Sequence, residues 1–288
     1  MGETAGARAR GLLLGQWGGA VQCQWWVTAA GLMLCAAQVG AWLILGLSAA
    51  DMVNLATADQ LDILIKQLAI TGGGLMLQIL FLAPLQTGRA LYFYRIAQGE
   101  QTVPVSTITA FFRHGYGKAV RLEIALLFWQ TLFGFFCFLP GVFALAGTQW
   151  LMPRTPADVQ WLVPLMAAVP LLLGLIVWRA LLWRFAAARY FLAKEHTARG
   201  ALRRSRRCMK SNAGTWAWLY LSFAGWWMLC LSVVGCLFAL PLVETAKADT
   251  VRQLEKAIAP GRHERMVPLG KMAAMKRKPA TKRKTAIA

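Results

Sequence analysis

The chain has 288 residues, of which 58% are hydrophobic and only 15% are charged, against roughly 25% charged residues in soluble domains. Its formal net charge is +19, and long uncharged blocks alternate with blocks rich in arginine and lysine. This composition excludes an ordinary soluble domain. It predicts an all-α, polytopic membrane helix bundle with a basic cytoplasmic face.

Four apolar stretches in the first two thirds of the chain are long enough to cross a bilayer, and most have tryptophans near their ends. We expect them at about 25–48, 68–85, 124–146 and 161–178. Arg8 and Arg10 precede the first stretch, as basic residues precede the apolar core of a secretory signal. Because residues 11–50 carry no charge, far more than such a core needs, we expect a retained span.

The hydrophilic connections alternate in charge. The connection after the second span is basic, and the one from Arg179 to Lys210 holds ten basic residues and one acid, Glu195. The connections after the first and third spans are nearly neutral or acidic. The positive-inside rule therefore places the N-terminus and both basic connections in the cytoplasm.

The number of crossings depends on the C-terminal part of the chain. A fifth span is expected at about 215–233, and a sixth at about 236–254 would return the C-terminus to the cytoplasm. Four charged residues in the sixth segment would each cost about 2.5–3.5 kcal/mol at the centre of a lipid-facing helix. They can pair at helical spacing, Glu244 with Lys247 and Asp249 with Arg252, or lie at the cytoplasmic interface. We favour six transmembrane helices, with five as the alternative.

The chain is expected to form one membrane domain, residues 1–258, followed by a basic, disordered cytoplasmic tail, residues 259–288. The tail is rich in lysine, alanine, proline and threonine and has no interleaved aromatic residues. Phosphate attraction without stacking or base contacts favours anionic lipid or plain solvation over nucleic acid as the partner of the tail.

The segment before the fifth span has the pattern of a basic interfacial helix. Its apolar or small positions share one helical face: Ala201, Leu202, Ser205, Cys208 and Met209. Its basic residues lie on the other face: Arg203, Arg204, Arg206, Arg207 and Lys210. One interpretation is a connector whose charges set the topology. The other is contact with anionic lipid headgroups, each basic residue contributing about 1 kcal/mol near the surface.

The same region resembles a bacterial integral membrane family, domain of unknown function 975. Its entry motif of alanine, serine, methionine and glycine-asparagine is matched, with Ser211 in place of the glycine, by Ala201, Ser205, Met209 and Asn212. The span at 221–226 is similar to its serine-phenylalanine-x-glycine-tryptophan pattern through Gly225 and Trp226, and Pro241 falls where the family has proline-tyrosine. Leu242 departs from that tyrosine. The resemblance implies a multi-helix membrane protein and no particular activity.

No catalytic, cofactor or metal signature occurs. The six cysteines form no CxxC pair, the three histidines are scattered, and no Walker loop, HExxH or GxSxG motif is present. Gly72, Gly73 and Gly74 indicate either close helix packing or an unwound segment of the kind that transporters use.

We therefore expect a non-enzymatic protein of a bacterial inner membrane, with both termini cytoplasmic and no cofactor, which acts through helix packing, lipid contact or partner contact. The alternative is a small-molecule or ion transporter or channel. A transporter predicts a water-lined cavity at mid-membrane that is reached by Lys66, Glu123 or the glutamines of the apolar segments, which are Gln22, Gln24, Gln38, Gln78 and Gln130. The substrate, a protein partner and the oligomeric state are left open by the sequence.

Overall fold

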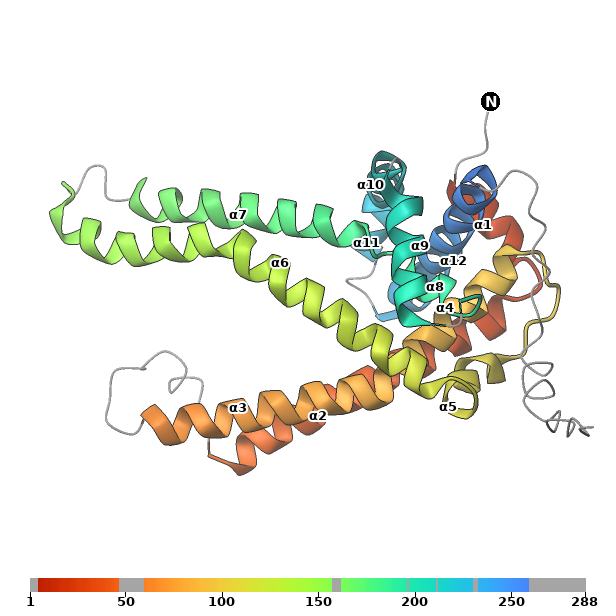
Figure 1. Cartoon of the computed structure of the whole chain (residues 1–288), viewed down its shortest axis with the longest axis horizontal. Helices are drawn as coiled ribbons and strands as arrows, with labels where there is room; N and C mark the ends of the chain where they lie inside the picture. Colours follow the sequence, from red (N-terminus) through yellow and green to blue (C-terminus); the bar gives the residue numbers. More distant parts are fainter. Residues whose placement is uncertain are drawn as a thin grey trace, which may run out of the picture. The chain divides into compact units, whose positions relative to one another are not determined.

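The computed structural model describes residues 5–46, 60–156, 162–195, 197–210, 212–229 and 233–258. Throughout these ranges the chain forms helices and no β-strand, which confirms the predicted all-α class (Figure 1). The predicted basic tail, residues 259–288, lies outside the described residues.

Four helices in the described part of the chain are long and apolar enough to cross a membrane, and they overlap the four spans predicted in the first two thirds of the sequence. Three of them contain α2 (Trp17–Ile44), α6 (Tyr116–Leu151) and α7 (Leu162–Trp183). The fourth is a continuous helix made of α3 (Gln60–Leu77), a π-helical turn η1 (Gln78–Leu82) and α4 (Ala83–Ala97). The membrane character of the chain is thus shown for these four segments.

Short elements join the spans. After α4, the 3-10 turn η2 (Val105–Thr109) and α5 (Ala110–Arg113) lead into α6. The 3-10 turn η3 (Met152–Arg154) follows α6. After α7 come α8 (Ala188–Phe191) and α9 (Ala198–Lys210), the predicted basic helix.

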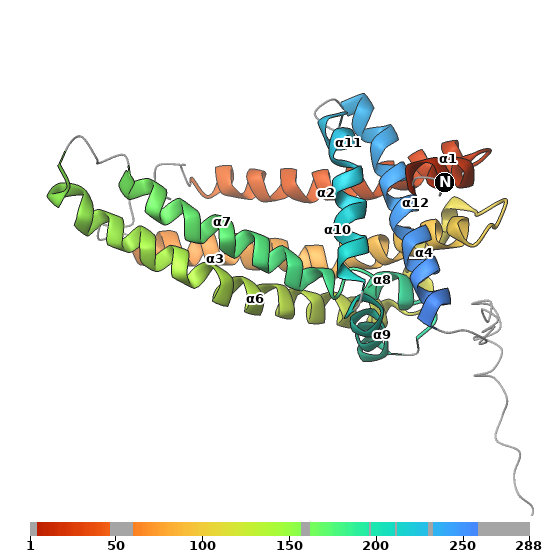
Figure 2. The same ribbon diagram turned by 90° about the horizontal axis from the view of Figure 1, so that it is seen from above.

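Helices α6 and α7 lie side by side along most of their length (Figures 1 and 2). Glycines permit this close approach: a Cβ atom on Gly174 would lie 2.4 Å from the carbonyl oxygen of Cys137, and one on Gly141 would lie 2.4 Å from the side chain of Leu171. The indole N–H of Trp178 also donates to the carbonyl of Gln130 at 3.0 Å. Small residues at the contact, together with an interhelical hydrogen bond, are typical of association within lipid.

The glycine run in α3 serves packing at one position. Gln38 of α2 occupies the space that a Cβ atom on Gly74 would need. The helix continues without a break through Gly72 and Gly73, so the unwound segment is not found. The helical irregularity comes directly after, in η1, where the carbonyl of Leu80 accepts a hydrogen bond from the Tyr116 hydroxyl at 3.0 Å. A π-helical turn changes the backbone pairing, and this side chain satisfies one of its carbonyl groups.

The predicted fifth span, 215–233, is occupied by two shorter helices in the structure, α10 (Ala213–Ser222) and α11 (Ala224–Leu229), which are separated by a turn at Phe223. They are followed by α12 (Val233–Ile258). None of these three is among the four candidate spans, because α10 and α11 are short and α12 is charged in its second half.

The charged half of α12 is packed inside the protein. Lys247 Nζ lies 3.0 Å from Glu244 Oε1, and Arg252 Nη2 lies 3.1 Å from Asp249 Oδ1, so the two pairs predicted at helical spacing are present. Helix α12 packs against α1 (Ala5–Leu13), α2 and α4. The charges of α12 therefore avoid the cost of facing lipid by contact with other helices.

Two arginines from elsewhere in the chain extend these pairs. Arg8 of α1 lies 3.3 Å from Asp249, and Arg89 of α4 lies 4.0 Å from Glu244. The hydroxyl of Tyr190 also donates to Glu244 at 3.2 Å. The N-terminal helix and the C-terminal half of α12 are thereby joined by an ion pair.

Candidate functional site

Helix α9 has a hydrogen-bonded cap at each end. At its start, the hydroxyl oxygen of Thr197 accepts a hydrogen bond from the backbone N–H of Gly200 at 3.1 Å, as an N-cap residue does. At its end, the side-chain amide of Asn212 donates to the carbonyl of Cys208 at 2.9 Å. Arg207 and Lys210 lie in the last turn, where cations interact favourably with the helix dipole.

The inner face of α9 consists of the five residues predicted from the sequence. All five are buried: Ala201, Leu202, Ser205, Cys208 and Met209. This face is covered by α6, α8 and α12 and not left open for the bilayer. The hydroxyl of Ser205 donates to the carbonyl of Arg184 at 2.9 Å, directly after the end of α7. Because the last carbonyls of a helix lack partners within it, this bond fastens α9 to the end of a candidate span.

Cys208 behaves as a small apolar residue within that face. Burial raises the pKa of its thiol to about 11, and the nearby carboxylate of Glu255 adds to the effect. The thiol therefore stays protonated and unreactive at neutral pH.

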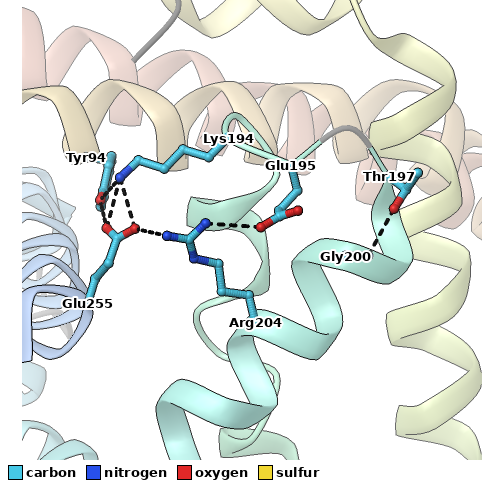
Figure 3. A network of polar contacts seen from close by, with 7 residues as sticks. All are labelled: Tyr94, Lys194, Glu195, Thr197, Gly200, Arg204 and Glu255. Atoms are coloured by element: carbon cyan, nitrogen blue, oxygen red, sulfur yellow. Dashed lines mark hydrogen bonds and ion pairs between the residues drawn. The ribbon is translucent and has the colours of Figure 1, made fainter. Parts of the chain in front are cut away.

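Arg204 belongs to an ion-pair network beneath α9 (Figure 3). Its guanidinium donates to Glu255 of α12 at 2.6 Å and to Glu195 at 3.1 Å. Lys194 Nζ lies 3.0 Å from both carboxylate oxygens of Glu255 and donates to the hydroxyl of Tyr94 at 3.0 Å. The Tyr94 hydroxyl in turn donates to Glu255. Arg204 therefore has a structural task that the sequence pattern did not reveal.

Arg206 lies against aromatic rings of the candidate spans. Its guanidinium carbon is 4.7 Å from the ring centroid of Trp129 in α6 and 4.8 Å from that of Phe185, just after α7. Both distances are within the range of cation–π attraction. Both rings belong to candidate spans, so Arg206 packs α9 against the sides of these two helices.

The remaining three residues of the predicted lipid-contact set point outward. Arg203, Arg207 and Lys210 are exposed, and in the described part of the chain no carboxylate forms an ion pair with them. The structure thus divides the set of five into two anchored arginines, Arg204 and Arg206, and an outer basic face, which we define as Arg203, Arg207 and Lys210.

The family-motif residues fall into two groups. Four lie on or beside α9: Ala201, Ser205, Met209 and Asn212. Three lie in α11 and α12, apart from the outer basic face: Gly225, Trp226 and Pro241. The guanidinium carbon of Arg10 lies 5.3 Å from the ring centroid of Trp226, and the carbonyl of Pro241 accepts a hydrogen bond from Thr245 at 2.8 Å.

Sequence reasoning missed the partners that hold α9 in place. Lys194, Glu195 and Glu255 were part of charged connections with no assigned role, and Tyr94 had none. The only local signal was that Glu195 is the single acid in a basic connection. No group of histidine, cysteine and acidic residues able to hold a metal ion occurs among the described residues.

Comparisons with known proteins add no further information on this site: no family model matches the chain. No curated protein matches it. No solved structure matches it either.

Proposed function

We propose that the protein is a non-enzymatic, multi-pass protein of a bacterial inner membrane that binds anionic lipid headgroups through the outer basic face of α9. The observation that carries this proposal is the division of α9 into a fully covered apolar face and an exposed cationic face. A helix sealed on one side by protein cannot use its apolar residues to insert into lipid, so its interaction with the membrane rests on charge.

The contacts of α9 with the candidate spans support this proposal. Arg206 packs on Trp129 and Phe185, which both belong to candidate spans. Ser205 is hydrogen bonded to the residue that follows α7. These contacts hold α9 against two candidate spans, and its outer basic face is the part that carries charge available to the phosphate groups of the bilayer.

We further propose six crossings with both termini in the cytoplasm. In this topology α10 and α11 together cross from the cytoplasm to the periplasm, and the apolar first half of α12 crosses back. The charged half of α12 then lies at the cytoplasmic face. Support comes from two ion pairs, Asp249 with Arg8 near the N-terminus and Glu255 with Arg204 in the basic connection. Groups in ion-pair contact lie on the same side of the membrane, which requires an even number of crossings between them. The resemblance to domain of unknown function 975 agrees with a multi-helix membrane protein of this kind.

The proposed lipid contact is tested by neutralising the outer basic face alone. We expect the triple variant Arg203→Gln, Arg207→Gln and Lys210→Gln, reconstituted in nanodiscs, to lose most of its preference for phosphatidylglycerol over phosphatidylcholine. The loss should be several-fold, because each basic residue near the surface contributes up to about 1 kcal/mol. Lipid retained by the purified protein, measured by native mass spectrometry, is the readout.

A charge-preserving variant is the matched control. Arg203→Lys with Arg207→Lys keeps the positive charge and changes only the shape of the group, so it should retain the preference for the anionic lipid. Arg204 and Arg206 are left unchanged in both variants because they have structural partners. An unaltered lipid preference in the triple glutamine variant would refute the lipid-binding role of α9.

A small-molecule transporter is the second candidate, since a polar cavity lies between three candidate spans. This cavity is reached by Glu123, Gln78 and Gln130, as the transporter hypothesis predicted, but Glu123 lies near the start of α6. A solute-uptake assay in proteoliposomes with the double variant Gln78→Leu and Gln130→Leu tests this candidate: uptake that requires the two glutamines would establish transport.

A further inference from the structure

The cavity between the spans has a volume of about 190 Å³. All of its lining residues belong to the candidate spans that contain α4, α6 and α8, and its polar ones are three glutamines and one ion pair. The glutamines are Gln78, Gln86 and Gln130, and the ion pair joins Glu123 to Arg189. Five polar side chains gathered among membrane-crossing helices are costly unless they meet one another or a polar ligand.

The charges that line the cavity are balanced, and part of their hydrogen-bonding capacity is unused. Arg189 contacts the carboxylate of Glu123 through Nε at 3.3 Å and Nη2 at 2.8 and 3.0 Å. These contacts leave the hydrogens of Nη1 directed elsewhere. The side-chain oxygen of Gln86 is buried and accepts no hydrogen bond from any described residue. That oxygen is closed off from the cavity, so the acceptor available to a ligand is the carboxylate of Glu123, which has about four lone-pair sites and receives three contacts from Arg189. The cavity therefore favours a ligand that brings an N–H donor.

We infer that this cavity binds the headgroup of a zwitterionic phospholipid of the phosphoethanolamine type. The primary ammonium of such a headgroup donates to Glu123, and its phosphate accepts from Nη1 of Arg189 and from the glutamine amides. Because Glu123 and Arg189 already balance each other, a ligand with one net charge would bring an uncompensated charge into the cavity, whereas a zwitterion brings none. The inference does not depend on the lipid-binding role of α9.

The size of the cavity fits this headgroup. A cavity of about 150 Å³ holds a benzene molecule. A space of 190 Å³ therefore accommodates roughly seven or eight heavy atoms by simple scaling, which is the size of phosphoethanolamine. It is too small for most soluble metabolites, whose pockets are typically of about 300 Å³ or more.

The bilayer is the source of the ligand because the cavity is open on the side of the apolar helices. Gln78 and Gln130 are exposed on the surfaces of η1 and α6, among exposed apolar side chains that include Phe81 and Phe128. A headgroup held among the polar residues would leave its acyl chains against these apolar surfaces, where lipid already belongs.

The test is a lipid competition on the full-length protein. Detergent-solubilised protein is mixed with equal amounts of phosphatidylethanolamine, phosphatidylcholine and phosphatidylglycerol, and retained lipid is measured by native mass spectrometry. Phosphatidylcholine carries the same phosphate and the same net charge but has no N–H donor. A difference in retention between it and phosphatidylethanolamine therefore reports hydrogen bonding by the ammonium. We expect phosphatidylethanolamine to be retained about tenfold over phosphatidylcholine, and the double variant Glu123→Gln with Arg189→Gln to abolish this difference. Phosphatidylglycerol is also expected at the outer basic face of α9, so its retention is compared only between the unaltered protein and the double variant and should not change.

Two further variants keep the test decisive. Gln78→Leu with Gln130→Leu changes exposed residues only and removes amides assigned to the phosphate, so it should lower the amount of phosphatidylethanolamine retained even if the ion-pair variant folds poorly. Asp62→Asn with Lys66→Gln removes another ion pair in the same continuous helix, with contact at 2.5 Å, and should leave the selectivity unchanged. Equal retention of phosphatidylethanolamine and phosphatidylcholine by the unaltered protein would overturn the inference. Displacement of bound lipid by millimolar soluble phosphoethanolamine would assign the cavity to a soluble zwitterion and overturn the lipid assignment.

Discussion

A single carboxylate, that of Glu255, holds together side chains from three parts of the chain. It accepts hydrogen bonds from Lys194, from Arg204 of α9 and from Tyr94 of α4 (Figure 3). The side chains of Glu255, Lys194 and Arg204 are only 13%, 15% and 28% exposed. Without Glu255, Lys194 would lose its carboxylate partner and Arg204 would keep only Glu195, so two largely buried cations would face each other with less compensation.

At this scale we expect Glu255→Ala to destabilise the protein by about 2–3 kcal/mol, less than the 3–5 kcal/mol typical of a fully buried pair because the network is partly exposed. The measurement is the midpoint of thermal unfolding in detergent. Asp62→Asn is the control: Asp62 forms an ion pair with Lys66 that is 66% and 38% exposed, and it should cost less than about 1 kcal/mol. Equal effects of the two substitutions would show that the network contributes nothing to stability.

The close packing of α6 against α7 depends on a glycine at the point of contact. Gly174 of α7 brings the backbone of α6 so close that a Cβ atom would collide with the carbonyl of Cys137. Gly147, also in α6, has no atom within 4 Å of such a Cβ. Both glycines lie in apolar helical segments of the sequence. Only the packing of α6 against α7 shows that Gly174 is at a close contact and Gly147 is not.

We expect Gly174→Ala to push α6 and α7 apart and to cost about 1–3 kcal/mol, as overpacking does. The matched variant Gly147→Ala should be neutral or stabilising by up to about 1 kcal/mol, since alanine is the better helix former. The midpoint of thermal unfolding in detergent measures both changes. Destabilisation by Gly147→Ala of the same size as by Gly174→Ala would contradict this account of the hairpin.

The proposed function depends on which side of the membrane each charged segment occupies. Ion pairs join Arg204 of α9 to Glu255 and Arg8 of the N-terminal helix to Asp249, so the proposed topology has these segments on one side of the membrane. The excess of arginine and lysine on them predicts that this side is the cytoplasm.

In a whole-cell labelling experiment we therefore expect a cysteine at Arg207→Cys to be reached by an impermeant maleimide only after the membrane is opened. The neighbouring Cys208 is buried, and its raised pKa keeps it protonated, so it should contribute no background. A cysteine at Asp158→Cys, in the connection between the third and fourth spans, is the control and should react from outside. A cytoplasmic reporter fused after Ala288 should be active if the number of crossings is even. Labelling of Arg207→Cys in intact cells would invert the orientation.

The sequence alone determined the features that depend on local pattern. Hydropathy and charge alternation located the four spans, and helical spacing identified the covered face of α9 and the pairs Glu244–Lys247 and Asp249–Arg252. Such features repeat with the period of one helix, so neighbouring residues suffice to define them.

Only the tertiary structure decided which charged groups meet across helices. It assigned Arg204 to Glu255, separated it from the outer basic face, and brought Gln78, Glu123 and Arg189 to one cavity from three different spans. These residues lie far apart in the chain, and no periodic pattern relates them. Their contact results from how the helices pack, because burying a charge among helices is tolerable only where another helix supplies its partner.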